Sequence, residues 1–277
     1  METLTTVAAL RERVRAWQTD GRRVGFVPTM GFLHAGHGSL MALARPRCDR
    51  LVVSIFVNPL QFGPNEDLSR YPRDLAGDER LCAAEGVDVV FAPTDFYPPD
   101  RATTVAVAGL TEGLCGAARP GHFDGVTTVV ARLFGVVQPQ LAVFGEKDFQ
   151  QLAVIRRMTT DLGLPVEIVG GALIRDPDGL AMSSRNTYLS VEERRRALSL
   201  SAALRAVVAS ATAGERDVDT LRATGRAALD VDRLDYFQIV DPASLRPLTT
   251  LDRPARVLVA GWIGRTRLID NMAVPWI

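Results

Sequence analysis

The sequence contains a single lysine, Lys147, although lysine and arginine together number 32 among its 277 residues. The other 31 basic residues are therefore arginines. Lysine is a compact ammonium on a flexible stem, whereas arginine is a wide planar fork. A position that keeps lysine in such a chain indicates a crowded site, for example one where phosphate oxygens converge. The simpler alternative, chance survival of one lysine, stays open.

Other features that the chain lacks argue against several classes of protein. The formal net charge is zero, which argues against a broad nucleic-acid-binding surface. No run of about 18 apolar residues occurs, so we expect no membrane span. The first six residues lack a charged start followed by an apolar run, so we expect no secretory signal. Cys48, Cys82 and Cys115 lie far apart, form no metal-type or redox-type pair, and favour a reduced cytoplasm.

Short apolar runs alternate with helical patterns over the first part of the chain. We expect strands at residues 23–29, 51–57, 87–91, 141–144 and 166–174, and helices at residues 36–44, 71–85, 125–137 and 149–162. Uninterrupted Val, Ile and Phe runs separated by helices predict a parallel sheet covered on both faces. The sequence therefore predicts a doubly wound, Rossmann-like α/β domain over residues 1–175, with ligands outside the carboxyl ends of its strands.

A polar turn at residues 175–179 marks a change in the pattern of the sequence, because strands and helices no longer alternate after it. Two alanine-rich helices are expected at residues 191–212 and 218–229, followed by two or three strands at residues 234–240, 256–260 and 267–270. Helices followed by a small antiparallel sheet predict a smaller α+β domain over residues 176–277.

The segment Pro28–Ser39 follows the first of these strands and opens a helix. It contains His34 and His37, two of the three histidines, together with three glycines. A helix N-terminus offers unpaired N–H groups and a favourable dipole for an anion. Imidazoles three residues apart share one helix face and can both donate to phosphate oxygens. Metal ligation and a purely structural role are the alternatives, although no cysteine and no acidic residue in helical register lies near.

A late segment, Met182–Asn186, places two serine hydroxyls and the Arg185 guanidinium in succession after an Asp-Gly turn. Such a loop suits a lid that closes over phosphate charge. The alternative is a serine that caps the start of a helix, and one serine could serve both purposes.

Neutral amide side chains follow two of the expected strands. Gln61 comes after one strand, and the pair Gln150 and Gln151 comes after another. Amides bind hydroxyl and carboxylate oxygens without adding charge. We therefore expect these positions to serve a carboxylic substrate.

The standard nucleotide signatures are absent from the sequence. It has no Gly-x-x-x-x-Gly-Lys-Ser/Thr loop, no Gly-x-Gly-x-x-Gly after a strand and no Gly-x-Ser-x-Gly elbow. His-x-Gly-His after the first of these strands, combined with the late Met-Ser-Ser-Arg loop, resembles the nucleotidyl-transfer superfamily that includes class I aminoacyl-tRNA synthetases. That resemblance implies attack on the α-phosphate of ATP with release of pyrophosphate.

The whole set of segments resembles the pantoate–β-alanine ligases, or pantothenate synthetases. The matching segments are Phe26–Gly31, His34–His37, Phe56–Phe62, Arg119–Val126, Phe144–Gln151 and Met182–Asn186. The resemblance implies that pantoate attacks Mg-ATP to give pantoyl adenylate and pyrophosphate. The amine of β-alanine then attacks the adenylate and releases AMP and pantothenate. It also implies Mg²⁺ and a homodimer built through the larger domain.

The same resemblance implies roles for individual residues in binding ATP. His37 would act as the proton donor, with His34, Lys147 and Arg185 as the other catalytic residues. Gly145 and Asp148 would hold the ribose, and the Ile174 backbone would lie near the adenine. The full ATP-binding set would be Met30, Gly31, Phe32, Leu33, His34, Ala35, Gly36, His37, Gly145, Glu146, Lys147, Asp148, Ile174, Met182, Ser183, Ser184 and Arg185.

For the other ligands, the resemblance implies that Gln61 and Gln151 bind pantoate and that Gln61 also lies near β-alanine. Asp78 is the candidate ligand for Mg²⁺, although phosphates and water could supply most of the coordination. Phe32 and Cys115 depart from the family pattern, which has a small residue at the first position and an acidic residue at the second.

Two alternatives compete with this interpretation. Another nucleotidyl transferase, acting on a different carboxylate or phosphate, would need extra basic residues for a second phosphate, and the neutral Gln61 and Gln151 argue against it. A nucleotide-binding protein without catalysis would be expected to have lost Lys147, a histidine or the Met-Ser-Ser-Arg loop, all of which are present.

Overall fold

The computed structural model describes residues 1–64 and 66–276; Asn65 and Ile277, which fall within the expected domain ranges, lie outside the described residues. The chain divides into two compact units. Unit 1 comprises Met1–Ala108, Arg119–Glu146 and Gln151–Ala172. Unit 2 comprises Gly109–Ala118, Lys147–Gln150 and the chain from Leu173 onward.

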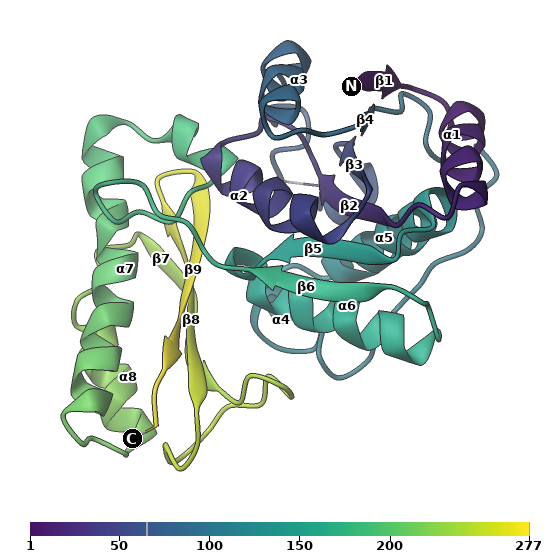
Figure 1. Cartoon of the computed structure of the whole chain (residues 1–277). Coiled ribbons are helices and arrows are strands. Elements are labelled where there is room, and N and C mark those ends of the chain that lie inside the picture. Colours follow the sequence, from purple (N-terminus) through teal and green to yellow (C-terminus); the bar gives the residue numbers. More distant parts are fainter. Residues whose placement is uncertain (65, 277) are drawn as a thin grey trace. The chain divides into compact units, whose positions relative to one another are not determined.

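Unit 1 is built on a six-stranded sheet with the strand order β1-β4-β3-β2-β5-β6 (Figure 1). All neighbouring strands pair in parallel. The strands are β1 Glu2–Leu4, β2 Val24–Thr29, β3 Arg50–Ile55, β4 Val89–Phe91, β5 Leu141–Gly145 and β6 Glu167–Gly171. The central strands are buried on both faces, as their uninterrupted apolar runs predicted. The doubly wound α/β fold is confirmed.

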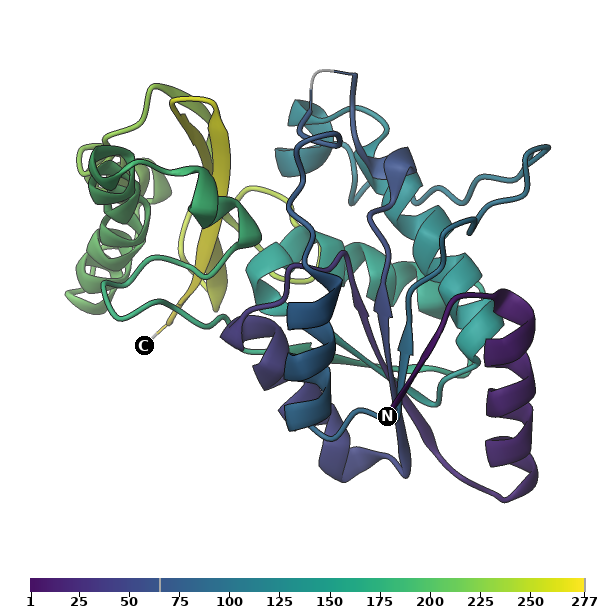
Figure 2. The same cartoon turned by 90° about the horizontal axis from the view of Figure 1, so that it is seen from above.

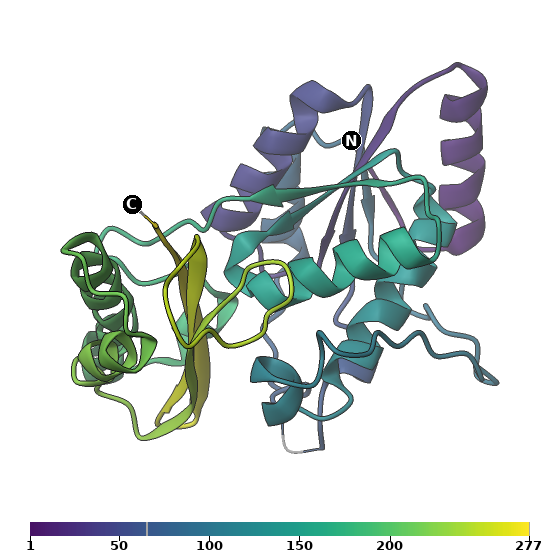
Figure 3. The ribbon, with the colours of Figure 1, turned by 90° about the horizontal axis from the view of Figure 1, so that it is seen from below.

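Helices cover both faces of this sheet (Figures 2 and 3). They are α1 Val7–Thr19, α2 Ala35–Ala44, α3 Leu75–Ala84, α5 His122–Val137 and α6 Phe149–Asp161, with 3-10 turns η1 Arg45–Arg47, η2 Pro59–Gln61 and η3 Glu146–Asp148. A Cβ on Gly171 would point at Leu40 of α2, whereas one on Gly170 would meet Leu152 of α6. Because adjacent strand residues point to opposite faces, α2 and α6 cover opposite faces. The α2 face also carries α3.

The strand order of unit 1 reverses at β2. Strand β3 pairs with one edge of β2, and β5 pairs with the other. In open α/β sheets, ligands bind beyond the carboxyl ends of the strands at such a point. The histidine-bearing segment follows β2 directly, and Gly145 is the last residue of β5.

Several element boundaries differ from the expected ones. Helix α3 begins at Leu75 and not at residue 71, because the Asp74 side chain caps it by accepting the N–H of Gly77. Helix α5 begins at His122, three residues earlier than expected, and β6 ends at Gly171 and not at residue 174. The sequence did not predict β1 or the short helix α4, Leu114–Ala118, because three and five residues carry little periodicity.

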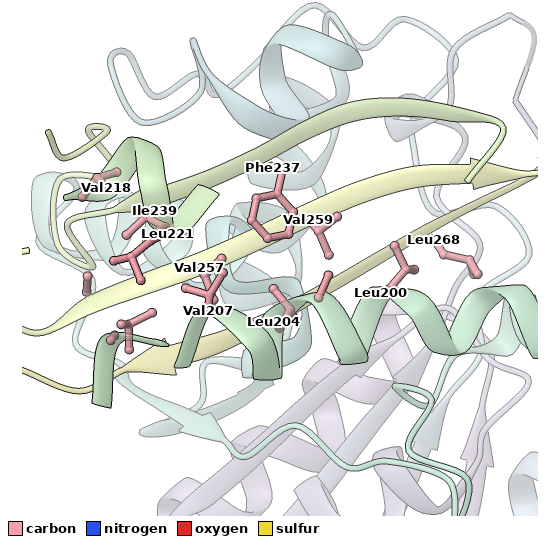
Figure 4. Close-up of a cluster of buried hydrophobic side chains, with 14 of the residues drawn as sticks. Leu200, Leu204, Val207, Val218, Leu221, Phe237, Ile239, Val257, Val259 and Leu268 are labelled. Carbon is pink, nitrogen blue, oxygen red and sulfur yellow. The ribbon is translucent and has the colours of Figure 1, made fainter. Parts of the chain in front are cut away.

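Unit 2 contains a three-stranded antiparallel sheet in the order β7-β8-β9 (Figure 1). Its elements include α4, η4 Ser184–Tyr188, α7 Val191–Thr212, α8 Val218–Arg226, β7 Arg233–Val240, β8 Ala255–Ile263 and β9 Thr266–Val274. One face of the sheet packs on α7 and α8 through a buried cluster that includes Leu204, Phe237 and Val259 (Figure 4). The expected antiparallel sheet with helices is confirmed. In the part of the chain that the structure describes, no helix is long and apolar enough to cross a membrane.

Candidate active site

His34 and His37 lie at the N-terminus of α2, and their rings are held by backbone N–H groups. The Nδ1 atom of His34 accepts the N–H of Gly36 at 3.2 Å, and Nδ1 of His37 accepts the N–H of His34 at 3.3 Å. Each neutral ring therefore carries its hydrogen on Nε2. The ring centroids are 4.1 Å apart, so the two rings lie side by side and each brings one Nε2–H donor. This arrangement suits an anion at the helix N-terminus.

Asp78 of α3 holds the loop that precedes the histidines. It is 2% exposed, and its two oxygens accept the backbone N–H groups of Phe32 at 2.9 Å and Leu33 at 2.6 Å. Phe32 has φ +52°, in the left-handed region that disfavours large side chains. This backbone gives a physical reason for a small residue at that position. Burial raises the pKa of Asp78, although the two N–H donors oppose the shift.

The described residues do not fit a protein-bound Mg²⁺ site. Among residues 1–64 and 66–276, no group of three or more His, Cys, Asp or Glu side chains could hold a metal ion. Both oxygens of Asp78, the candidate ligand, already accept N–H groups from the loop after β2. The geometry therefore favours loop anchoring as the role of Asp78.

The Gln61 side chain is buried and held by its neighbours in unit 1. Its Oε1 accepts the Asn58 amide at 3.0 Å, and its Nε2 lies 3.3 Å from the Met30 sulfur. Asn58 also donates to the carbonyl of Gly125 at 3.0 Å and accepts the hydroxyl of Tyr97 at 2.9 Å. Asn58 therefore fixes the orientation of the Gln61 amide. Asn58 lies in the matching segment Phe56–Phe62, but the sequence did not show this linking role.

The Gln61 backbone is held by a second network. Its carbonyl accepts from the Arg119 guanidinium at 3.3 Å and lies 2.9 Å from Nδ1 of His122. Arginine has no acceptor, so the 3.0 Å contact from Arg119 to Nε2 of His122 places the ring hydrogen on Nδ1, which donates to Gln61. Glu66 accepts two hydrogen bonds from Arg119, at 2.7 and 2.6 Å. The third histidine of the sequence is thus a positioning residue.

Glu66 should make the stability of unit 1 depend on pH. Burial raises the pKa of its carboxyl, but the hydrogen bond and charge of Arg119 outweigh burial, and the net pKa lies below the ordinary value of 4.5. A lowered carboxyl pKa stabilises the folded state above the unfolded-state pKa, and this contribution is lost as pH falls through the folded-state pKa. We expect Glu66→Gln to cost on the order of 1 kcal/mol near neutral pH.

Urea unfolding of Glu66→Gln and of the unchanged protein, at neutral pH and at several acidic values, measures this dependence. The difference in free energy of unfolding should shrink below a pH of about 4.5, as Glu66 becomes protonated. A difference that stays constant over the whole range would contradict the assignment.

Lys147 belongs to unit 2 and lies in η3. Its side chain is 22% exposed, and its ammonium is 3.8 Å from a carboxylate oxygen of Asp148. Its backbone carbonyl accepts the side-chain amide of Asn271 at 2.9 Å. The ammonium is thus only loosely held by this ion pair with Asp148, whereas the backbone that carries it is anchored.

The two adjacent glutamines after Lys147 differ in their surroundings. Gln150 is 4% exposed; its Oε1 accepts the N–H of Cys115 at 2.8 Å, and its Nε2 donates to the carbonyls of Leu110 at 2.8 Å and Gly113 at 2.9 Å. Gln151, in contrast, is half-buried in α6 of unit 1. The structure thus gives Gln150 an internal, structural role and leaves Gln151 as the candidate for substrate.

Cys115, the second departure from the family pattern, lies against a cation. Its sulfur is 3.5 and 3.6 Å from two nitrogens of Arg267 and 3.1 Å from the hydroxyl of Tyr236. Arg267 also donates to Asp235 at 2.7 Å. The adjacent guanidinium explains why an acidic side chain would suit position 115.

The late serine loop continues from a short hairpin in unit 2. The N–H of Met182 donates to the carbonyl of Ile174 at 3.0 Å. Ser183 then caps η4, since its hydroxyl accepts the N–H of Arg185 at 3.3 Å. The cap considered as an alternative is therefore present at Ser183. Ser184 is 7% exposed.

The expected site residues are divided between the two units. Unit 1 brings together Met30 with Gln61, and Asp78 with the loop of the histidine pair. Unit 2 carries Lys147, Asp148 and the residues from Ile174 to Arg185. Sequence reasoning missed the polar residues that hold these groups, namely Tyr97, Arg119, His122, Arg175, Asp270 and Asn271. Only Arg119 and His122 had a local signal, because they lie in one of the matching segments.

Comparison with known proteins gives consistent, full-length matches. The family described as Pantoate-beta-alanine ligase matches residues 2–273. Pantothenate synthetase 1 of Bradyrhizobium diazoefficiens is 54% identical over 280 residues, which cover 100% of this chain and 99% of the relative. The crystal structure of pantothenate synthetase from Thermus thermophilus is 51% identical, covers 99% of both chains and superposes with a TM-score of 0.94. Pantoate-beta-alanine ligase from Francisella tularensis, complexed with Beta-gamma ATP and beta-alanine, is 32% identical, with a TM-score of 0.81 over 98% of this chain and 97% of the other.

Proposed function

We propose that this chain, which belongs to the pantoate–β-alanine ligase family, activates pantoate as an adenylate. The overall reaction joins pantoate to β-alanine to form pantothenate. A pantoate carboxylate oxygen forms a bond to the α-phosphorus of ATP, and the bond to the bridging oxygen breaks to release pyrophosphate. The amine nitrogen of β-alanine then attacks the pantoyl carbonyl carbon, loses a proton and displaces AMP. The relative crystallised with Beta-gamma ATP and β-alanine supports this choice of substrates.

The observation that carries the proposal is the orientation of the histidine pair. Nδ1 of both His34 and His37 is used by backbone N–H groups, so the Nε2–H of each ring is a donor for phosphate oxygens. Negative charge grows on the α-phosphate and on the leaving pyrophosphate, and preorganised donors lower that barrier. We assign His37 as the residue that donates a proton to these phosphate oxygens.

Residues of unit 2 neutralise the triphosphate in the proposed reaction. Lys147 and Arg185 bring positive charge, and the hydroxyls of Ser183 and Ser184 donate hydrogen bonds to phosphate oxygens. The other nucleotide contacts are the ribose, assigned to Gly145 and Asp148, and the adenine, assigned to the backbone at Ile174. Magnesium would enter as part of Mg-ATP, coordinated mainly by phosphate oxygens and water, because no three His, Cys, Asp or Glu side chains of the described residues form a metal site.

Gln61 and Gln151 are proposed to bind pantoate, with Gln61 also near β-alanine. The Gln61 amide is held by Asn58, so a hydroxyl or carboxylate oxygen would meet a fixed group. Because both side chains are neutral, they bind the pantoate carboxylate without competing for the cations that serve the phosphates.

Pyrophosphate release from Mg-ATP by the purified protein tests the proposed reaction. We expect no sustained release with ATP alone, limited release on addition of pantoate, and continued turnover once β-alanine is present. If pyrophosphate release does not depend on pantoate but increases with another acid, the alternative is favoured, a nucleotidyl transferase with a different substrate.

The homodimer built through the larger domain, implied by the family resemblance, and the cytoplasmic location, favoured by the cysteines, stay predictions. The three cysteines are free thiols in the structure, which supports a reducing compartment. Cys82 is buried, and burial raises its pKa to about 12, so its thiol stays protonated at physiological pH.

A further inference from the structure

Two adjacent polar residues of β9, Asp270 and Asn271, are each only 3% exposed. Successive strand residues point to opposite faces of a sheet, so the two side chains serve opposite faces. Asp270 shares its face with Leu268 and Met272, which belong to or pack against the buried cluster beneath α7. Burying a polar side chain is costly unless it forms hydrogen bonds. The hydrogen-bond partners of Asp270 and Asn271 therefore indicate the role of each residue.

Asn271 connects β9 to the segment that carries the single lysine. Its Nδ2 donates to the backbone carbonyl of Lys147 at 2.9 Å, and its Oδ1 accepts from Nε of Arg256 at 2.7 Å. The Arg256 guanidinium in turn lies 4.3 Å from the centroid of the Phe149 ring, two residues after Lys147. The start of α6 and the end of η3 are therefore held at two points by the outer face of one sheet.

Asp270 connects the same strand to the hairpin before the serine loop. Arg175 donates to its two carboxylate oxygens at 2.7 and 2.9 Å, and Arg175 also donates to the carbonyl of Gly179 at 3.1 Å. Arg175 pairs with Ala181 across this hairpin. A bidentate pair fixes orientation as well as distance, so it sets the direction in which the chain enters the Met182–Arg185 loop.

We propose that Asp270 and Asn271 form a positioning pair for the ATP phosphates: through consecutive residues of β9 they fix both the Lys147 backbone and the Arg175 hairpin that leads into the Ser183–Arg185 loop. The inference rests on the proposed function, in which both segments handle the triphosphate. Because Asp270 and Asn271 are consecutive residues of β9, they fix the Lys147 segment and the serine loop relative to each other. Neither residue is proposed to contact ATP itself.

The test compares Asn271→Asp and Asp270→Asn with the unchanged protein. Asn271→Asp keeps the acceptor for Arg256 but replaces the donor to Lys147 with an oxygen, and Asp270→Asn weakens the pair with Arg175. We expect each variant to lower kcat/KM for ATP in pantoate-dependent pyrophosphate release by roughly tenfold or more, because small displacements of positioned groups are costly. At saturating ATP, the KM for pantoate should change by less than about twofold.

Binding of a non-hydrolysable ATP analogue distinguishes positioning from a general loss of structure. Asn271→Asp should weaken this binding about tenfold in the otherwise unchanged protein but by less than about twofold in a Lys147→Ala background, because a residue that acts through another shows non-additive effects. Asp241→Asn is the matched control: Asp241 also accepts backbone N–H groups in unit 2, those of Ala243 and Ser244, but it does so in the turn after β7. It should leave kcat/KM for ATP unchanged.

Equal, additive losses in both backgrounds, or a parallel fall in every kinetic parameter together with the melting temperature, would overturn the positioning role. An active unchanged protein with fully active Asn271→Asp and Asp270→Asn variants would overturn it as well. Failure of the proposed function gives a different result, since the unchanged protein would then show no pantoate-dependent release of pyrophosphate.

Discussion

Replacement of Lys147 by alanine is expected to abolish adenylate formation and to leave the fold intact. The ammonium forms an ion pair at 3.8 Å with the carboxylate of Asp148, whose side chain is 47% exposed, and such pairs contribute little to stability. Its backbone carbonyl, which Asn271 holds, is unchanged in the variant. Loss of a preorganised charge at a developing phosphate charge typically costs about 10²–10³ in rate.

Pyrophosphate release with pantoate present measures the rate, and circular dichroism with thermal unfolding checks the fold. Near-normal turnover by a folded Lys147→Ala variant would remove Lys147 from the reaction.

Lys147→Arg tests whether crowding explains the single lysine. The change keeps the positive charge but replaces a compact ammonium with a wide planar group. If phosphate oxygens and neighbouring residues leave no space for that fork, the rate should fall at least about tenfold, which corresponds to roughly 1.4 kcal/mol. If the Lys147→Arg variant is fully active, crowding does not explain the single lysine, and chance survival is the better explanation.

Gly125→Ala is expected to displace the Gln61 segment. A Cβ at position 125 of α5 would lie 2.6 Å from the backbone nitrogen of Gln61 and even closer to the carbonyl carbon and oxygen of Leu60. These are backbone atoms, so η2 itself must move. Inserting a methyl group into such a contact costs roughly 1–3 kcal/mol. It also disturbs the bond from Asn58 to the Gly125 carbonyl, which orients the Gln61 amide.

The expected kinetic result of Gly125→Ala is a KM for pantoate raised by roughly tenfold or more, with a much smaller change in the KM for ATP. Gly135→Ala provides the control in the same helix. A Cβ there meets no atom of the described residues within 4 Å, and alanine should stabilise the helix by about 0.4–1 kcal/mol. If Gly125→Ala binds pantoate as well as Gly135→Ala does, the proposed link between α5 and Gln61 is wrong.

The doubly wound fold of unit 1 and the location of the histidine pair followed from the sequence by itself. Both depend on local patterns: uninterrupted apolar runs predict buried parallel strands, and a glycine-rich turn after a strand predicts a helix N-terminus. The structure confirms the parallel sheet and places His34 and His37 in the first turn after β2. The sequence did not predict the tautomers of these rings, because they depend on contacts with backbone N–H groups that form only in the folded chain.

Only the tertiary structure decided which residues hold the candidate site in place. Asn271 reaches the carbonyl of Lys147 across 124 positions in the chain, and the Gly125 carbonyl meets Asn58 across 67. No local spacing marks such pairs, because a strand asparagine or a helix glycine has the same sequence neighbours whether or not a distant segment packs against it. Long-range partners are chosen by how the elements pack, whereas periodicity records only the conformation of each element.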